Sequence, residues 1–244
     1  MELLIPNWPA PTQIKACSST RLGGQSSAPY SGLNLGEHVG DDWILVEKNR
    51  QRLAAYAKMP SAPVWLNQTH STQVIELSAP SMKTQDADGA WTRQPNVVCS
   101  AMTADCLPVL LTDTEGTQVA AVHAGWRGLA GGIIENALAQ FDGEVMAWLG
   151  PAIGATAFEV GQDVLDAFVA FDRAAKQAFI PREQAGKWLA DMAMLATQRL
   201  NRAGVEQVYY SDLCTFNDPQ RFYSYRRDGV TGRQASFIWI DSNA

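Results

Sequence analysis

The chain has 244 residues, of which 46% are hydrophobic and 18% charged, and its formal net charge is −6 at pH 7. This composition is typical of a globular protein with a substantial core, and it excludes the apolar poverty and charge excess of a disordered chain. An acidic chain without a run of Lys or Arg lacks the positive field that nucleic-acid phosphates require, so no nucleic-acid partner is expected.

The N-terminal segment lacks the basic and apolar regions of a secretory signal peptide. No stretch approaches the roughly 20 apolar residues that a membrane-spanning helix needs. Four cysteines without any CxxC spacing favour a reducing compartment over a disulfide framework. The sequence therefore predicts a cytoplasmic protein with no membrane partner.

Hydrophobic periodicity divides the first half of the chain into short strands around one helix. The helix is expected over 43–57, with Asp41 or Asp42 as its cap and Pro60 beyond its end. The strands are expected at 13–18, 63–66, 74–77, 97–102, 107–111 and 119–122. The segment 113–116 supplies a hairpin turn between the last two strands.

After residue 128 the pattern becomes helical and stays so up to Phe141. The later elements are expected as a strand at 145–149, helices at 162–171 and 187–203, and strands at 207–210 and 235–240. Hairpins alternate with strand–helix units, and no run of Pro, Gly and Ser is long enough to separate two domains. We therefore expect an α/β (α+β) fold with a single domain over residues 1–244, in which helices pack outside mixed sheets.

Three residues that commonly bind metals, His70, Cys106 and His123, lie next to predicted strand ends. Two imidazoles and one thiolate suit a borderline-soft ion such as zinc. Three protein ligands would leave a fourth position for water or substrate, as catalytic zinc sites require. The same residues could instead form a Cys–His nucleophilic pair, because an adjacent imidazole activates a thiolate, and spacing leaves both interpretations open.

Asp105 directly precedes Cys106. It is a candidate acceptor for a ligating histidine or a candidate general base. A carboxylate that caps or closes the turn is the structural alternative.

Several cationic residues are candidates for binding an anion. Arg127 follows Trp126 at the expected start of a helix, where backbone N–H groups and a guanidinium together favour negative charge. Arg21 lies in a Gly-rich turn, and Arg226 lies in a late basic segment that also offers Arg227 and Arg233. Each of these arginines could equally be solvated surface. His38 lies among glycines and is expected to line the pocket without binding metal.

A series of motifs in order along the chain resembles the YfiH, or multicopper polyphenol oxidase (laccase-domain), family. They are CSSTRLGG at 17–24, NLGEHVGD at 34–41, NR at 49–50, QTH at 68–70, DADG at 86–89, TADCLP at 103–108, HAGWRG at 123–128, LGPAIG at 149–154 and FYSYRRD at 222–228. The resemblance covers essentially the whole chain. One departure is that His70 lies between Thr69 and Ser71, where many members have Val and Gly.

The resemblance implies a four-layer α/β/β/α fold and a purine nucleoside phosphorylase that converts adenosine or inosine to the free base and ribose 1-phosphate. It further implies adenosine deaminase and methylthioadenosine phosphorylase activities. The family's metal ligands map onto His70, Cys106 and His123, with zinc as the metal and copper as the alternative. Cys106, His123 and Asp105 are the catalytic candidates, and the expected partners are a purine nucleoside and inorganic phosphate.

Three other functions remain open at this point. Bacterial relatives are ascribed the hydrolysis of mis-made peptidoglycan precursors. Copper-dependent phenol oxidation is attributed to some members, although three histidines are too few for a true laccase. A non-catalytic metal-binding protein is the third alternative. The oligomeric state is not predicted.

Overall fold

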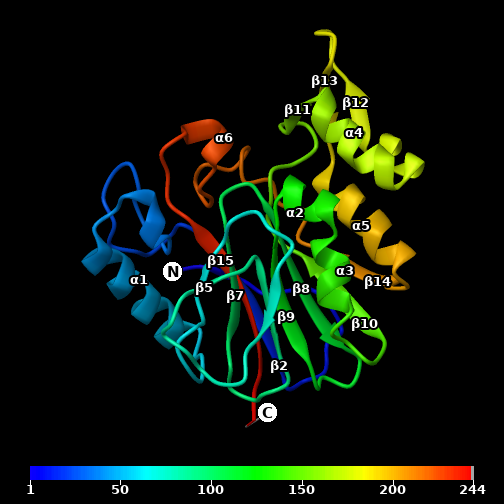
Figure 1. The fold of residues 1–244 in the computed structure, drawn as a ribbon. Coiled ribbons are helices and arrows are strands. Elements are labelled where there is room, and N and C mark those ends of the chain that lie inside the picture. The colour runs from blue at the N-terminus through cyan, green and yellow to red at the C-terminus, as the bar shows by residue number, and fades with distance from the viewer. Residues whose placement is uncertain (243–244) are drawn as a thin grey trace.

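The chain forms four stacked layers of the order α/β/β/α, as a computed structural model that describes residues 1–242 shows (Figure 1). Residues 243 and 244 of the expected 1–244 domain lie outside the described residues. Helix α1 (Trp43–Tyr56) forms one outer layer, and Asp42 caps it by accepting a hydrogen bond from the Ile44 N–H. Helices α2 (Trp126–Gly131), α3 (Ile133–Leu138) and α5 (Met192–Arg202) form the other.

Two β-sheets form the inner layers. The first is antiparallel throughout and has the strand order β1 (Leu3–Leu4), β2 (Ile14–Ser19), β15 (Gln234–Ile240), β7 (Cys99–Thr103). The second is mixed and has the order β14 (Gln207–Tyr210), β10 (Val145–Leu149), β8 (Leu107–Asp113), β9 (Val119–Ala124), β6 (Gly89–Thr92), β4 (Val74–Glu76). Only its two outermost pairs, β10–β14 and β4–β6, are parallel. The expected mixed α/β architecture with helices outside the sheets is therefore confirmed.

Smaller elements complete the fold. They are the parallel pair β3 (Leu66–Asn67) and β5 (Gln85–Asp86), the antiparallel sheet of β11 (Glu159–Gly161), β13 (Lys187–Ala190) and β12 (Phe179–Pro181), the helices α4 (Gln162–Phe171) and α6 (Tyr225–Asp228), and the 3-10 helices η1 (Glu37–Val39) and η2 (Arg173–Ala178). The three-stranded sheet and α4 form the yellow-green lobe at the upper right of Figure 1.

Three hydrophobic cores lie between the four layers. Strand β15 contributes to two of them because successive side chains of a strand point to opposite faces. Phe237 and Trp239 pack toward α1, whereas Ile238 and Ile240 pack between the two sheets. The largest core lies between the second sheet and helices α2, α3 and α5. Every layer is therefore covered on its apolar side.

The expected helix over 187–203 is wrong in its first part. Residues Lys187–Ala190 form β13, the central strand of the three-stranded sheet. The helix begins only after Asp191, whose side chain accepts a hydrogen bond from the Met194 N–H at 2.9 Å. Pairing with two neighbouring strands outweighed the local helical pattern. The expected helical stretch up to Phe141 is likewise divided into α2 and α3 at Gly132, which has a φ of 100°.

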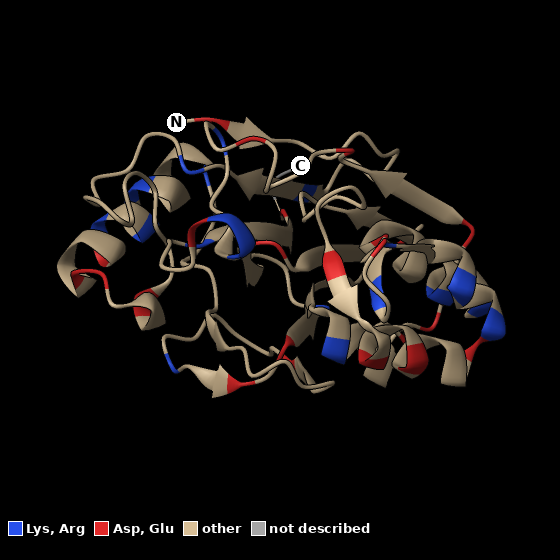
Figure 2. Cartoon of the chain, turned by 90° about the horizontal axis from the view of Figure 1, so that it is seen from above, with Lys and Arg blue, Asp and Glu red and all other residues tan. Residues whose placement is uncertain are grey.

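The surface carries charges of both signs. Figure 2 shows Lys and Arg interspersed with Asp and Glu along the helices, with most of the chain belonging to neither class. Among residues 1–242, no helix combines the length and the apolar character needed to cross a bilayer.

The core beneath α1 provides a test of the layered arrangement. Phe237 is fully buried, and its ring meets that of Trp65 edge-on with centroids 5.8 Å apart. We expect Phe237→Ala to lower the free energy of unfolding by about 3–5 kcal/mol, because it removes apolar contacts and leaves a cavity. Met82→Ala, at an exposed position, should change it by less than about 0.5 kcal/mol. Urea unfolding curves measure both, and equal effects would contradict the assignment of Phe237 to the core.

Candidate metal centre

The site lies where the chain crosses from the first sheet to the second. Strand β7 ends at Thr103, strand β8 begins at Leu107, and Cys106 closes the short connection between them. His123 lies in β9, which pairs with β8, and His70 lies in the loop between β3 and β4. The topology therefore brings together three residues that are distant in sequence.

His70, Cys106 and His123 form a group whose potential ligand atoms all lie within 4.8 Å of one another. The Cys106 Sγ lies 3.9 Å from the His70 Nε2, and the two imidazole rings meet edge-on with centroids 4.9 Å apart. His123 is buried, Cys106 is half-buried and His70 is exposed. Two imidazoles and one thiolate that open to solvent on one side could hold a metal ion such as zinc.

Gly125 shows that the space between the three side chains is restricted. A Cβ at this position would lie 2.9 Å from the His70 Cδ2, 3.2 Å from the Cys106 Sγ and 3.6 Å from the His123 Cε1. Its φ of −62° is open to any residue, so space and not backbone conformation requires glycine here. The absence of a side chain at residue 125 lets the three donors approach one another. The residues present therefore fit a metal ion.

Asp88 holds two of the three donors in place. Its carboxylate accepts a hydrogen bond from the His123 Nδ1 at 2.8 Å. It also accepts from the backbone N–H groups of the His70 loop, namely those of Thr69, His70 and Ser71 at 3.1, 2.9 and 2.6 Å. With its Nδ1 engaged, the His123 ring directs its Nε2 toward the site, which is how a buried carboxylate orients a ligating histidine.

Hydrogen bonds hold the pKa of Asp88 well below its usual range. Burial alone would raise this pKa, but the hydrogen bonds from His123 and Ser71 outweigh it. Asp88 therefore contributes stability above its unfolded-state pKa of about 3.9, and that contribution is lost as the pH falls toward the native pKa.

The Cys106 thiol and the buried His123 imidazole shift each other's pKa in opposite directions. Burial would raise the pKa of Cys106, but the charge and hydrogen bonds of His123 and then of His70 lower it to about 6. Burial would lower the pKa of His123, but Cys106 and Asp88 raise it to about 9. In the metal-free protein the pair is therefore a thiolate and an imidazolium at neutral pH, and the thiolate is the form that binds metals.

Asp105 does not contact a histidine in this structure. Its Oδ1 accepts from the Thr215 Oγ1 and its Oδ2 from the backbone N–H of Arg226, both at 2.7 Å. Asp105 has a φ of 95°, and His70 a φ of 60°. Such conformations are costly for residues other than glycine and persist only where surrounding contacts impose them.

Two adjoining cavities flank the group of three. The larger, of about 410 Å³, is lined by His38, Gln68, His70, Met102, Thr103, Ala104, Cys106, His123, Tyr225 and Arg233. The smaller, of about 130 Å³, is lined by Ala104, Asp105, Cys106, Trp126, Ile153, Phe158, Met192, Tyr225 and Arg226. Cys106 and Tyr225 belong to both walls. The site thus has a polar side and an aromatic, mainly apolar side.

Two of the arginines expected to bind an anion are absent from the walls of both cavities. Arg21 donates to the carbonyl oxygens of Ser31 and Pro219, each at 3.2 Å. Arg127 is exposed, and its guanidinium lies 4.3 Å from the centre of the Trp126 ring. Neither residue is among those that line these cavities.

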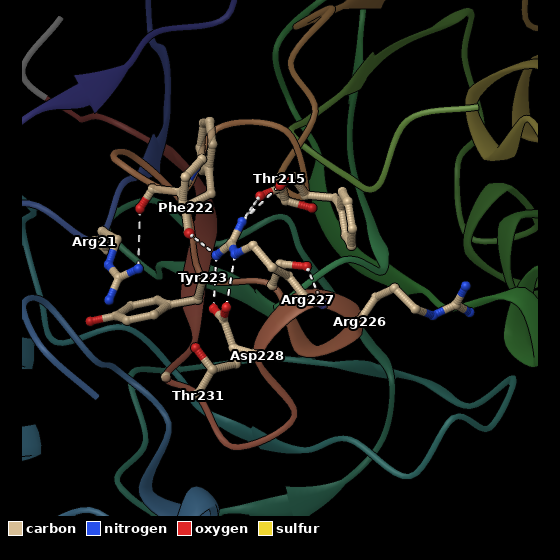
Figure 3. Close-up of polar contacts among 12 residues, drawn as sticks. Arg21, Thr215, Phe222, Tyr223, Arg226, Arg227, Asp228 and Thr231 are labelled. Carbon is tan, nitrogen blue, oxygen red and sulfur yellow. Dashed lines mark hydrogen bonds and ion pairs between the residues drawn. The ribbon is translucent and has the colours of Figure 1, made fainter. Parts of the chain in front are cut away.

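Arg226 and Arg227 have different roles in α6. Arg226 lines the smaller cavity, and its Nη1 donates to the carbonyl oxygen of Glu159 at 2.7 Å. Figure 3 shows it extending away from Arg227, which forms a two-point ion pair with Asp228. The remaining N–H groups of the Arg227 guanidinium donate to the carbonyl oxygens of Thr215, Phe216 and Phe222. Its guanidinium is fully used in holding α6 against the preceding loop.

The structure places two further residues, Asp88 and Arg233, at the site. Asp88 belongs to the DADG motif at 86–89, which carried no assigned role, although a carboxylate before a buried strand is a signal for an orienting acceptor. Arg233 ends the late basic segment and, unlike Arg226, lines the same cavity as the three candidate ligands. His38 also lines that cavity and lies outside the group of three.

The chain is similar to known proteins along nearly its whole length. A family model described as multi-copper polyphenol oxidoreductase laccase matches residues 15–241. The chain is 50% identical over 242 residues to a purine nucleoside phosphorylase YfiH of Escherichia coli (strain K12), with 98% of this chain and 99% of that protein covered. It is 49% identical over 245 residues to a purine nucleoside phosphorylase of Haemophilus influenzae, with 99% and 100% covered.

Solved structures share the fold. The crystal structure of a Neisseria meningitidis protein matches with a TM-score of 0.94 at 47% identity, with 99% of this chain and 100% of that chain covered. The crystal structure of YlmD from Geobacillus stearothermophilus matches with a TM-score of 0.88 at 29% identity, with 99% and 97% covered. The expected fold class is therefore confirmed by structures of similar proteins.

Removing the Asp88 charge should weaken both the fold and metal binding. We expect Asp88→Asn to lower the free energy of unfolding of the metal-free protein by about 2–3 kcal/mol, because an amide cannot accept all the hydrogen bonds of the buried carboxylate. Zinc affinity should fall about 10- to 100-fold, because His123 loses its orienting acceptor. Urea unfolding and competition with a chromophoric chelator measure the two effects. Asp86→Asn, at an exposed neighbouring position, is the control, and a similar loss in that variant would contradict the role of Asp88.

The lowered pKa of Cys106 predicts selective alkylation of the metal-free protein. The rate of Cys106 modification by iodoacetamide should rise with pH, with a midpoint near pH 6, and reach a plateau at higher pH. The reason is that the thiolate is the reactive form. Cys17 and Cys99, whose pKa values burial raises to about 12, should stay unmodified in the folded protein. Peptide mass spectrometry distinguishes the sites. Added zinc should protect Cys106, and a midpoint at pH 8.5 or above would contradict the thiolate–imidazolium pair.

Proposed function

Because the chain belongs to the YfiH-type family whose model is described as multi-copper polyphenol oxidoreductase laccase, we propose that it is a zinc-dependent purine nucleoside phosphorylase. Relatives about 50% identical over nearly their whole length carry the name purine nucleoside phosphorylase. The observation that carries the proposal is the placement of His70, Cys106 and His123 between a polar cavity and an aromatic one.

The proposed reaction joins phosphate to a purine nucleoside and releases the base. A phosphate oxygen forms a bond to C1′ of the ribose while the bond from C1′ to N9 of the purine breaks. The electron pair of that bond leaves with the base, which takes up a proton, and the products are the free base and ribose 1-phosphate. Such a reaction needs an anion-binding group, an apolar surface for the base and a stabiliser for developing charge.

The chain supplies a residue for each need. His70, Cys106 and His123 would hold the zinc ion, which when bound would stabilise negative charge as a Lewis acid. Asp105 is the only carboxylate among the residues that line the two cavities, and we assign proton transfer to it. Of the anion-binding candidates, His38 lines the polar cavity and Arg226 the aromatic one, and the proposal keeps both for substrate contact.

We extend the proposal to adenosine and methylthioadenosine as substrates, because both also join a purine N9 to C1′ of a ribose or a 5′-modified ribose. Deamination of adenosine at the same site is part of this extension. Zinc is the proposed metal, and copper is the alternative because the His2Cys set also suits it. All four cysteines are free, which accords with a reducing, cytoplasmic location that would keep the Cys106 thiol available.

A second candidate function rests on the hydrogen bond between Asp88 and His123. Asp88, His123 and Cys106 have the order of carboxylate, imidazole and thiol that metal-free cysteine hydrolases use. A hydrolase of this kind, such as one that edits mis-made peptidoglycan precursors, would be fully active after metal removal. Metal dependence therefore separates the two functions.

The decisive experiment combines metal analysis with a phosphorolysis assay. We expect zinc-loaded protein to convert inosine and phosphate to hypoxanthine and ribose 1-phosphate, and chelation to abolish the conversion. Cys106→Ala and His123→Ala should each lose zinc and lower kcat/KM at least about 100-fold, because both remove a metal ligand.

Cys214→Ser, which changes a thiol outside the group of three, is the matched control and should retain zinc and turnover. Chromatography of the purine products gives the rates. Inosine left intact by the zinc-loaded wild type, or turnover by His123→Ala at the wild-type rate, would refute the proposal.

A further inference from the structure

Arg233 is the only arginine or lysine among the residues that line the larger cavity. It shares this wall with His38 and with all three candidate metal ligands. Arg226 belongs to the smaller cavity, and Arg21 and Arg127 line neither. A fixed positive charge in the polar half of the site is therefore supplied by Arg233 alone.

The backbone of Arg233 is anchored to the segment that carries His38. Its N–H donates to the Asn34 Oδ1 at 2.8 Å, and its carbonyl oxygen accepts from the Leu35 N–H at 3.0 Å. A Cβ on Gly36 would lie 2.7 Å from the Arg233 Cγ, so the glycine makes room for the arginine side chain. Arg233 and His38 are thus held on the same side of the cavity.

Part of the Arg233 guanidinium is held by the protein and part is left for a ligand. Its Nη1 donates to the carbonyl oxygens of Thr231 and Gly232 at 3.1 and 2.9 Å. Within residues 1–242, its Nε and Nη2 donate no hydrogen bond and no carboxylate pairs with the group. A guanidinium that is positioned at one end and open at the other suits two-point binding of a phosphate.

The opposite side of the site has a different chemistry. Trp126, Phe158 and Tyr225 line the smaller cavity, and Ala104, Cys106 and Tyr225 form the wall that it shares with the larger one. Displacement at C1′ requires the entering phosphate and the departing base to lie on opposite sides of the ribose. Two cavities that meet at Cys106, one cationic and one aromatic, satisfy this requirement.

We propose that Arg233 binds the phosphate co-substrate in the larger cavity and that the purine occupies the aromatic cavity beyond Cys106. The inference rests on the proposed phosphorylase function, and it assigns each half of the reaction to one side of the site. Arg233 would be a binding residue that contacts the phosphate directly.

The first test compares phosphate with nucleoside in Arg233→Gln. The KM for phosphate should rise about 10- to 100-fold because a charge-assisted pair is lost, whereas the KM for inosine should change less than about threefold. Arg202→Gln is the matched control, because Arg202 is an exposed arginine on α5 that pairs with Asp172. Arg233→Lys keeps the positive charge but loses the two-point geometry of the guanidinium. Its KM for phosphate should therefore lie between those of wild type and Arg233→Gln. Trp126→Ala should show the opposite pattern, with a higher KM for inosine and an unchanged KM for phosphate.

A binding measurement keeps the inference testable without turnover. Titration of zinc-loaded protein with inorganic phosphate, followed by 31P NMR, should show binding to wild type that is weakened about 10-fold or more in Arg233→Gln. If wild type binds phosphate but leaves inosine intact, the phosphorylase function fails while the titration still decides the role of Arg233.

Two outcomes would overturn the assignment. One is equal phosphate affinity in wild type and Arg233→Gln, and the other is the absence of phosphate binding by wild type. Zinc content and urea unfolding of each variant confirm that the comparison is between folded, metal-loaded proteins.

Discussion

The carboxylate of Asp88 is fully buried, and the hydrogen bonds it accepts join the two parts of the site that the sheets alone would not connect. His123 is fixed by its strand, but His70 lies in a loop and depends on the N–H groups of residues 69–71 that point at this carboxylate. A buried charge without partners would be strongly destabilising, so the loop and the ring must stay in place to satisfy it. Hydrogen bonds within the protein therefore hold His70 and His123 in place without a bound ligand.

The sheets determine where that geometry can form. Cys106 lies in the connection from β7 to β8, where the chain passes from one inner layer to the other. Gly125 keeps the space next to the three donors free of side-chain atoms. The segments around Asn34 and Arg233, about 200 residues apart in sequence, are joined by backbone and amide hydrogen bonds. The site thus draws on both ends of the chain and on its centre.

Hydrophobic periodicity was sufficient to predict most helices and strands, because elements such as Val145–Leu149 and Gln162–Phe171 bury one face or both. It was insufficient for Lys187–Ala190, where a strand pairing that is remote in sequence outweighs the local pattern. The three candidate ligands could be identified from residue type, but their convergence required the family resemblance. Asp88 was not assigned from the sequence, because an acid in a turn looks the same whether it is buried in a site or solvated. Arg233 was only one of several guanidinium groups in a basic segment, and the structure was needed to place it in the cavity of the three candidate ligands.

The conformation of His70 bears on the choice between a metal centre and a Cys–His–Asp triad. A triad needs only Asp88, His123 and Cys106, and it would leave His70 free to adopt an ordinary conformation. His70 instead has a φ of 60°, which costs on the order of 1 kcal/mol or more for a residue with a side chain, and its N–H donates to Asp88 at 2.9 Å. The same carboxylate that orients the His123 ring thus holds the backbone of His70 in a strained turn beside the Cys106 thiol. A three-donor metal site would use both histidines in this arrangement, whereas a nucleophilic pair would need only one of them.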